Sequence, residues 1–578
     1  METARINDHI RYEPDDACPP LVSFSVALQS VVLVLAPTVV IVAITVRSAN
    51  QADSYLEWAV FAALVIGGLA TAMQSGRVGR LGAGHLLITC ATPSYIAISL
   101  IALEAGGPGL LATLTVLAAV CQFALAAWLP SLRRIVTPVV SGTVLMLIVV
   151  SVLPLAFDRF QEVPVGALPA AGPLVAAVTL VVTSAMVLLA RGSWRIWTSL
   201  IGIAAGCALS APFGLYDVRR VIDAPWLGLP GSELPGLVLT PGADFWALLP
   251  AFVILSLVLG IKIVGDGVVI QQVSRRRPGT TDYRVIQGVL NTNAAGVLLS
   301  GVVGTPPTTA YSASSAAIIN LTGVAARRVG YGVGVILVAL AFLPKVTAAL
   351  IAVPSPVMGA YLLFLMGLLF VEGMRTVVQE GLDQRKTLVV ALAFSIGVGV
   401  EYHGFFARLF GDAWAASLDT GMTVGALVAV LMTMSMEVFG RRPIRLKGLL
   451  ETKSLPSIYK LLRGLAARHT WDDTATERLC SAGEETLLCL LQPGNQYESD
   501  AAPRLTINAR GSASSVEMEF LAVFVDENLE DHLAYLDEQI DVFDDREMSF
   551  RLLRHYASSV RHQKFHGMDV VTVRVDRA

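Results

Sequence analysis

The sequence predicts an all-α polytopic membrane protein with fourteen transmembrane segments in a seven-plus-seven inverted repeat, followed by a soluble α+β domain. Three observations lead to this fold class. Only 15% of the 578 residues are charged and 54% are hydrophobic, whereas soluble proteins average about 25% charged residues. Apolar runs of roughly 20 residues, long enough to span a bilayer, recur through residues 21–440. Similar short motifs also recur seven segments apart.

The distribution of Lys and Arg supports a count of fourteen segments. Cytoplasmic loops of membrane proteins are enriched in these residues. With the N-terminus inside, alternate loops hold nineteen Lys and Arg residues on one side and six on the other. This bias predicts that both termini are cytoplasmic and that the protein is integral to the cell (inner) membrane. The apolar segments begin near residues 21, 55, 86, 109, 135, 172, 196, 244, 285, 308, 329, 356, 386 and 420.

Composition divides the chain into three parts. Residues 1–20 carry charges and prolines without an apolar run, which predicts a cytoplasmic N-terminal segment rather than a cleavable signal. Residues 21–440 form the membrane domain, and residues 450–578 form a cytoplasmic α+β domain. The six cysteines lack the spacing of a metal site or a disulfide framework, so we expect no metal and no cofactor.

Two pairs of motifs indicate the internal repeat. ATPSY (91–95) and PVVSG (138–142) in the first half correspond to GTPPTTAY (304–311) and PSPVMG (354–359) in the second. Because the motifs lie seven segments apart, an odd number, the two halves must have opposite orientations in the membrane. Inverted repeats with broken helices at corresponding positions are typical of secondary transporters, and the breaks indicate the binding site.

The break at residues 304–311 places two prolines and several hydroxyl groups at membrane depth. Prolines should end one segment and leave a short half-helix beyond it, whose free N–H groups favour polar or anionic ligands. The hydroxyl groups would then surround a small polar cavity. Alternatively, they bond to their own helix or join neighbouring helices. The hydroxyl residues in question are Thr308, Thr309, Ser312, Ser314 and Ser315.

Several separated stretches resemble the xanthine/uracil permeases of the nucleobase–ascorbate transporter family. They are YEPDD…PP (12–20) followed by Gln29, LRRIVTPVVSGTVLMLI (132–148), IVGDGVVIQQVSRRR (263–277) and NTNAAGVLLSGVVGTPPTTAYSASSAAIINLTGVAARRVG (291–330). The resemblance implies a core domain of segments 1–4 and 8–11 and a gate domain of segments 5–7 and 12–14. It also implies a substrate held between the half-helices of segments 3 and 10, and an elevator-type movement of the core.

The resemblance implies the candidate site residues, and the departures from the family pattern are informative. Lys262 and Asp266 stand where the family has an acidic residue and a second polar residue on segment 8. Lys262 is either locked to Asp266, presented to an anionic or carbonyl-rich substrate, or directed towards the cytoplasmic end of its segment. Tyr95 is either an aromatic platform for the substrate or an ordinary core residue. The candidate substrate-binding residues are Gln29, Ser94, Tyr95, Lys262, Asp266, Asn293, Tyr311, Ser312, Ala313, Ser314 and Ser315.

The C-terminal domain is similar to the ATPase fold of histidine kinases and anti-sigma factors. Glu485 matches a family residue, but Cys489 occupies the position of the Asn that holds magnesium in that family, and the glycine-rich lid segments are absent. We therefore expect a degenerate regulatory or assembly module. Its pattern predicts strands at 517–525 and 569–575 and a helix at 550–563.

These observations predict a permease rather than an enzyme. The expected activity is secondary active transport of nucleobases such as uracil or xanthine, or of related small heterocycles, coupled to protons. The family resemblance implies a homodimer, and the basic run Arg275–Arg277 is explained by topology rather than nucleic-acid binding. Two alternatives stay open: a transporter of the same fold that uses Lys262 to carry an anion, and a membrane sensor that signals through the C-terminal domain.

Overall fold

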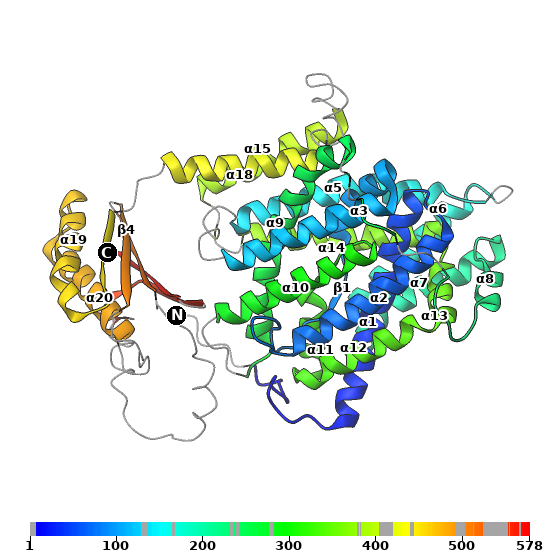
Figure 1. The fold of residues 1–578 in the computed structure, drawn as a ribbon, viewed down its shortest axis with the longest axis horizontal. Coiled ribbons are helices and arrows are strands. Elements are labelled where there is room, and N and C mark those ends of the chain that lie inside the picture. Colours follow the sequence, from blue (N-terminus) through cyan, green and yellow to red (C-terminus); the bar gives the residue numbers. More distant parts are fainter. Residues whose placement is uncertain are drawn as a thin grey trace. The chain divides into compact units, whose positions relative to one another are not determined.

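The computed structural model forms two compact units, which are described separately: residues 1–279 with 285–434, and residues 280–284 with 435–578 (Figure 1). The structure describes residues 7–128, 137–164, 168–231, 235–238, 240, 242–276, 282–378, 381, 383–403, 420–439, 444–491, 503–512, 514–523, 553, 555–565 and 568–577.

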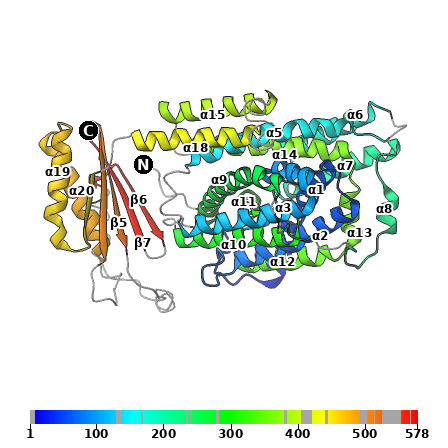
Figure 2. The same ribbon diagram turned by 45° about the horizontal axis from the view of Figure 1, so that its top comes forward.

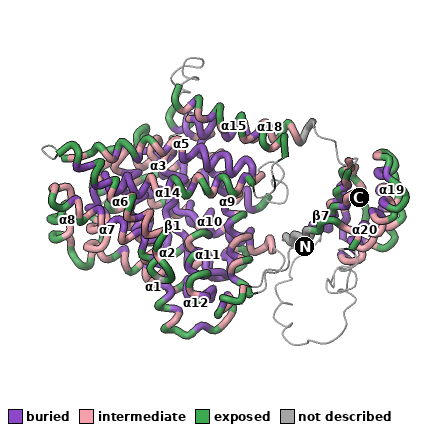
Figure 3. The backbone as a smooth tube through the Cα atoms, turned by 180° about the vertical axis from the view of Figure 1, so that it is seen from behind, coloured by how far each residue is buried: buried purple, intermediate pink, exposed green. Residues whose placement is uncertain are grey.

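The first unit is a bundle of apolar helices. Buried residues run through its middle, around β1 and along α10 and α14 (Figure 3). Its longer helices are α1 (Pro20–Ser48), α2 (Asp53–Ser75), α3 (Ile96–Ala127), α5 (Pro138–Gln161), α6 (Ala171–Leu189), α7 (Thr198–Ser210), α9 (Ala243–Val273), α10 (Tyr283–Val303), α11 (Ser312–Thr322), α12 (Arg327–Ala341), α14 (Ser355–Val378), α15 (Gln384–His403) and α18 (Gly421–Phe439); α8 (Val218–Asp223) and α13 (Pro344–Ile351) are short.

The described helices are consistent with an integral membrane protein. Nine of them are long and apolar enough to span a bilayer, and the bent pair α12 and α13, with an angle of 82°, would make ten. A further apolar helix lies at Gly421–Met436. A helix, or a strand followed by a helix, lies at each of the fourteen predicted segments, but α11, α15 and α18 are not among the nine. The count of fourteen spans stays a prediction.

The two predicted breaks contain extended backbone, so the all-α expectation for the membrane domain needs one correction. Segment 3 begins as β1 (Thr89–Ala91) and a 3-10 turn, η1 (Pro93–Tyr95), and segment 10 begins as β2 (Thr308–Ala310). The two strands pair antiparallel with Cys90 opposite Thr309. Prolines prevent helix here, and each strand satisfies backbone groups of the other.

A short helix follows each strand. After β1 and η1, α3 is interrupted at Gly106 and Gly107, where φ reaches 68°, so segment 3 supplies only a half-helix before segment 4 starts. After β2, α11 has eleven residues and ends at Gly323. Because the strands are antiparallel, the two half-helices start at opposite ends of the pair. The predicted half-helices of segments 3 and 10 are therefore present.

Helices α5 and α14 cross at two glycines that the repeat motifs predicted as landmarks. A Cβ atom on Gly142 would lie 2.5 Å from the carbonyl oxygen of Gly373, and one on Gly359 would lie 2.7 Å from that of Ala156. Gly142 precedes Ala156 by fourteen residues, and Gly359 precedes Gly373 by the same number. The two contacts are therefore related by the inverted repeat.

Packing within the first unit separates two helix groups, named here after the division that the resemblance implies. In the core group, α2 and α12 pack along each other, α3 packs on α9, and α11 packs on α9. In the gate group, α14 packs on α5, α6 and α7, and α15 packs on α5. The two groups meet where α5 contacts α9 and α3, and where α1 contacts α7 and α14.

The second unit is a two-layer α/β structure with its own core. Helices α19 (Leu455–Arg468) and α20 (Asp473–Leu491) cover one face of a five-stranded antiparallel sheet (Figure 2). Side chains of Met518 and Phe520 are fully buried against them. The strands, in spatial order, are β3 (Ile444–Leu449), β4 (Arg504–Gly511), β5 (Ser515–Val523), β7 (Met568–Asp576) and β6 (Ser559–Phe565).

The strands β5 and β7 confirm the two predicted strands in this region. The helix predicted over 550–563 is wrong in its second half, because Ser559–Phe565 forms β6 and pairs with β7. Val560 and Phe565 in this stretch are residue types that favour strands, and pairing with β7 provides hydrogen bonds for its backbone. Residues 524 and 525 of the first predicted strand, and residues 550–552 and 554 of the predicted helix, lie outside the described residues.

Candidate functional site

The crossing of β1 and β2 positions the start of α11 against α9. Side chains complete the hydrogen bonding of the interrupted backbone: the Thr71 hydroxyl accepts from the N–H of Thr89, and the Ser315 hydroxyl accepts from the N–H of Ile88. The Thr309 hydroxyl donates to that of Thr92. Thr309 and Ser315, two of the five conspicuous hydroxyl residues, therefore support the break itself, as the structural alternative expected.

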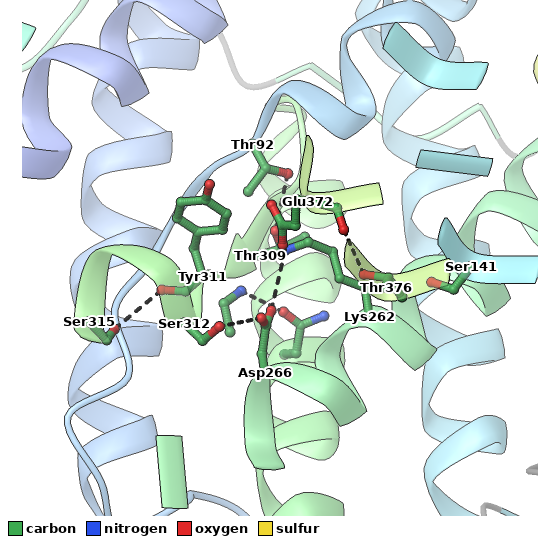
Figure 4. A network of polar contacts seen from close by, with 12 residues as sticks. Thr92, Ser141, Lys262, Asp266, Thr309, Tyr311, Ser312, Ser315, Glu372 and Thr376 are labelled. Atoms are coloured by element: carbon green, nitrogen blue, oxygen red, sulfur yellow. Dashed lines mark hydrogen bonds and ion pairs between the residues drawn. The ribbon is translucent and has the colours of Figure 1, made fainter. Parts of the chain in front are cut away.

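A polar cluster lies where α11 begins (Figure 4). The ammonium group of Lys262 is 3.3 Å from Asp266 Oδ2, one turn along the same helix. The hydroxyl of Ser312, the first residue of α11, donates to Asp266 Oδ1 over 2.5 Å. The ring of Tyr311 lies under the ammonium group, with 4.7 Å between Lys262 Nζ and the ring centroid. The structure thus brings together four residues predicted from sequence.

The burial of this cluster limits what Lys262 can do. The side chains of Lys262 and Asp266 are only 9% and 6% exposed. The ammonium group of Lys262 is therefore held inside the protein by carboxylates and does not reach water at a helix end, which argues against that alternative. Asp266 lies near the N-terminal end of α11, where the helix dipole favours a negative charge.

Sequence reasoning missed a third charged member of the cluster. Glu372 on α14 places Oε1 3.3 Å from Lys262 Nζ, and its side chain is 27% exposed. An acidic residue within an apolar run is costly in lipid and is a functional candidate by default, so a signal existed. Arg375, three residues later, is one of the nineteen Lys and Arg residues counted on the predicted cytoplasmic side, so Glu372 lies near the predicted end of its segment.

A second network, behind the strand pair, holds the two breaks together. Asn293 on α10 accepts from the backbone N–H of Ala310 over 2.8 Å and donates to Gln122 Oε1 over 2.9 Å. Gln122 in turn contacts the hydroxyl of Tyr95 at 3.3 Å. Asn293 and Tyr95 are each 1% exposed. Both predicted residues are thus engaged in the scaffold, and Gln122, an amide within an apolar run, is a residue that sequence reasoning missed.

The remaining predicted residues lie around these two networks. Ser94 is buried in η1, and Ser315 is buried on α11. Ala313 is exposed and Ser314 is half-buried, both in the first turn of α11. Gln29 is half-buried on α1, and among the described contacts none joins it to Lys262. Their roles in binding stay predictions.

A cavity of about 180 Å³ lies beside the half-helix of segment 3. Ile98 and Ile101 of α3, Val152 of α5 and Glu401 of α15 are among its lining residues, whereas Lys262, Asp266 and Tyr311 are not.

Comparison with known proteins identifies the family. A model of the Permease family, the xanthine/uracil permeases, matches residues 22–404, which is most of the membrane domain. The chain belongs to the xanthine/uracil permease family. This confirms the resemblance to the nucleobase–ascorbate transporters for the membrane domain, whereas the resemblance of the C-terminal domain to ATPases stays a prediction.

Three relatives illustrate the similarity of this permease to others. It is 30% identical to a putative purine permease of Clostridium perfringens, over 68% of this chain and 86% of that one. It is 26% identical to the xanthine permease XanP of Escherichia coli K12, over 74% and 95% of the two chains. It is 29% identical to a uracil permease of Bacillus caldolyticus, over 59% and 78%.

Family membership and the apolar helices together indicate that this permease is an integral membrane transporter rather than an enzyme. Its polar cluster has a defined charge arrangement. The lysine at position 262 is balanced from its own helix by Asp266 and from α14 by Glu372.

Proposed function

We propose that this permease is a secondary active transporter that moves a neutral nucleobase, such as uracil or xanthine, or a related small heterocycle, across the inner membrane. Cargo binds at the start of α11, and an elevator-type movement of the core group coupled to protons carries it. The names of the three relatives support this cargo class. The observation that carries the proposal is the Lys262–Asp266–Ser312 cluster at the broken segment.

The chemistry of the cluster suits such a cargo. Uracil and xanthine are neutral planar rings whose edges alternate N–H donors and carbonyl acceptors. Lys262 can donate to a carbonyl, and Asp266 can accept from a ring N–H. The ring of Tyr311 offers an aromatic face beside them. One lysine and two carboxylates together carry a net charge of minus one. This net charge supports proton coupling, because a proton carried with the cargo would neutralise it.

The same charge count argues against the anion alternative. If Lys262 were the recognition element for an anion, its charge should be available to the cargo. Instead, two carboxylates lie within 3.3 Å of its ammonium group, so the three charges sum to minus one. An anion entering this site would meet a net repulsion, whereas a neutral ring would not.

Uptake by cells that express the protein tests this proposal. We expect saturable accumulation of labelled uracil or xanthine, which excess unlabelled compound and a protonophore both abolish. The Asp266→Asn variant should lose at least tenfold in uptake, about 1.4 kcal/mol or more of lost transition-state stabilisation, because the carboxylate that balances Lys262 and accepts from Ser312 is removed.

Asp244→Asn is the matched control, because Asp244 lies on the same helix and is exposed. It should leave uptake within twofold of wild type. Absence of uptake of uracil, xanthine and uric acid by wild-type protein that is verified in the membrane would count against the nucleobase proposal. Uptake by Asp266→Asn at the wild-type rate would remove Asp266 from the site.

We also propose that both termini are cytoplasmic, that the permease forms a homodimer, and that the C-terminal domain is a degenerate, ATPase-like regulatory module.

Removing the C-terminal domain distinguishes a transporter from a membrane sensor. The cut should fall before Ile444, because β3 is the first strand of its sheet. We expect the truncated protein to keep at least half of the wild-type uptake, measured per molecule in the membrane. Complete loss of uptake in a correctly inserted truncated protein would contradict this expectation.

A further inference from the structure

We propose that the Lys262–Glu372 ion pair is a latch between the core and gate groups, and that cargo opens it by taking the place of Glu372 at the ammonium group. This inference rests on the proposed function, in which Lys262 contacts the cargo. It assigns a role to Glu372, which holds the empty site closed and sets the affinity for cargo.

Among the described contacts, the pair is one of few polar links between the two helix groups. Lys262 belongs to α9, which packs with α3 and α11, whereas Glu372 belongs to α14, which packs along α5. A weaker polar contact lies one turn away, where the Ser141 hydroxyl of α5 is 3.4 Å from the carbonyl oxygen of Val258 on α9. Relative movement of the groups must therefore break the Lys262–Glu372 contact.

The two carboxylates around Lys262 are held unequally. Asp266 lies on the same helix as Lys262, is 6% exposed and also accepts from Ser312. Glu372 comes from the other group and is 27% exposed, and among the described contacts its carboxylate is held by Lys262. A ring carbonyl that approaches Lys262 would therefore displace Glu372 rather than Asp266, and Lys262 would stay charge-balanced by Asp266.

Close packing between α5 and α14 fixes the position of Glu372. The next residue, Gly373, lies at the close crossing of α5 and α14, where a Cβ atom on it would be 2.8 Å from the carbonyl oxygen of Gly142. This contact sets the rotation of α14 and directs Glu372 towards α9 (Figure 4). Because the crossing belongs to the gate group, Glu372 stays with that group when the latch opens.

Competition between Glu372 and cargo makes an unusual prediction for Glu372→Gln. Removing the charge should weaken the empty closed state and strengthen cargo binding at the same time. We expect the dissociation constant for the transported nucleobase, measured by isothermal titration on purified protein, to fall about fivefold or more, the lower range of measured couplings between sites. A residue that is only structural would not tighten binding.

A second measurement needs no cargo. Amide hydrogen exchange of the ligand-free protein should be faster in α9 and α14 of Glu372→Gln than in the wild type, because the contact between the groups is weakened. Asp158→Asn is the matched control, since Asp158 is an exposed carboxylate on α5 of the gate group. It should change neither the exchange nor the dissociation constant.

The two measurements separate the possible failures. If wild-type protein binds no nucleobase, the proposed function fails, and the exchange measurement still decides whether the latch exists. If exchange in α9 and α14 is unchanged in Glu372→Gln, the latch is overturned. If exchange rises but cargo binds more weakly than to wild type, Glu372 is a direct ligand of the cargo, and the competition is overturned.

Discussion

Replacing Gly142 with valine is expected to force α5 and α14 apart. The first atom of the new side chain would lie 2.5 Å from the carbonyl oxygen of Gly373 and 2.9 Å from the backbone nitrogen of Val377. Both obstacles are backbone, so no side-chain rotation relieves them. We expect the free energy of unfolding to fall by about 3 kcal/mol or more, at or above the top of the usual range for an overpacked core. The variant should therefore melt at a lower temperature in detergent, and little of it should reach the membrane.

Gly367→Ala is the control for this prediction. Gly367 lies on α14, and a Cβ atom there would meet nothing within 4 Å. Alanine is also the better helix former, so the melting temperature should be unchanged or slightly higher. If Gly142→Val melted like the wild type, the close approach of α5 and α14 would be refuted.

Replacing Asn293 with leucine is the second change with a large expected effect. It removes the acceptor of the Ala310 N–H and the donor to Gln122 while leaving both groups buried. A buried polar group that loses its partner costs about 1–3 kcal/mol, so the two together should lower the free energy of unfolding by about 2–6 kcal/mol. Since β2 leads directly into α11, we expect uptake to fall at least tenfold.

Asn291→Leu provides the comparison for Asn293→Leu. Asn291 lies on the same helix, two residues earlier, and its amide donates to the carbonyl oxygen of Arg80 at an exposed position. Its replacement should change the free energy of unfolding, measured by a thermal melt, by about 0.5 kcal/mol or less, the usual range for a surface change. Asn293→Asp keeps an acceptor for Ala310, so it should rank between the two leucine variants. Equal melting temperatures for all three would show that the network is not structural.

The break points of the fold could be predicted because they depend on local chemistry. Pro306 and Pro307 remove N–H donors and interrupt a helix wherever they stand, and the motifs repeat at nearly equal spacing. The partner of each interrupted stretch could not be predicted. Cys90 and Thr309 face each other from positions 219 residues apart, and residue patterns say nothing about pairing over such a distance in three-residue strands.

The candidate site was predictable only in part, for a similar reason. Lys262 and Asp266 are four residues apart, so helix geometry alone places them on one face. Glu372 and Gln122 reach the two networks through packing between helices, which a single sequence does not specify. Hydroxyl side chains such as Ser315 are conspicuous in the sequence. Some of them accept hydrogen bonds from the interrupted backbone, so their number alone does not indicate a ligand site.

The pairing of β1 with β2 also has a consequence for how the chain is made. β1 is complete at Ala91, but its partner ends at Ala310, 219 residues later. At synthesis rates of about 5–20 residues per second, the ribosome needs about 10–40 s to deliver the second strand. Throughout that time, the first half must remain in the bilayer with an unmatched edge. Slow codons or a stalled ribosome between these points would prolong the interval and favour misassembly.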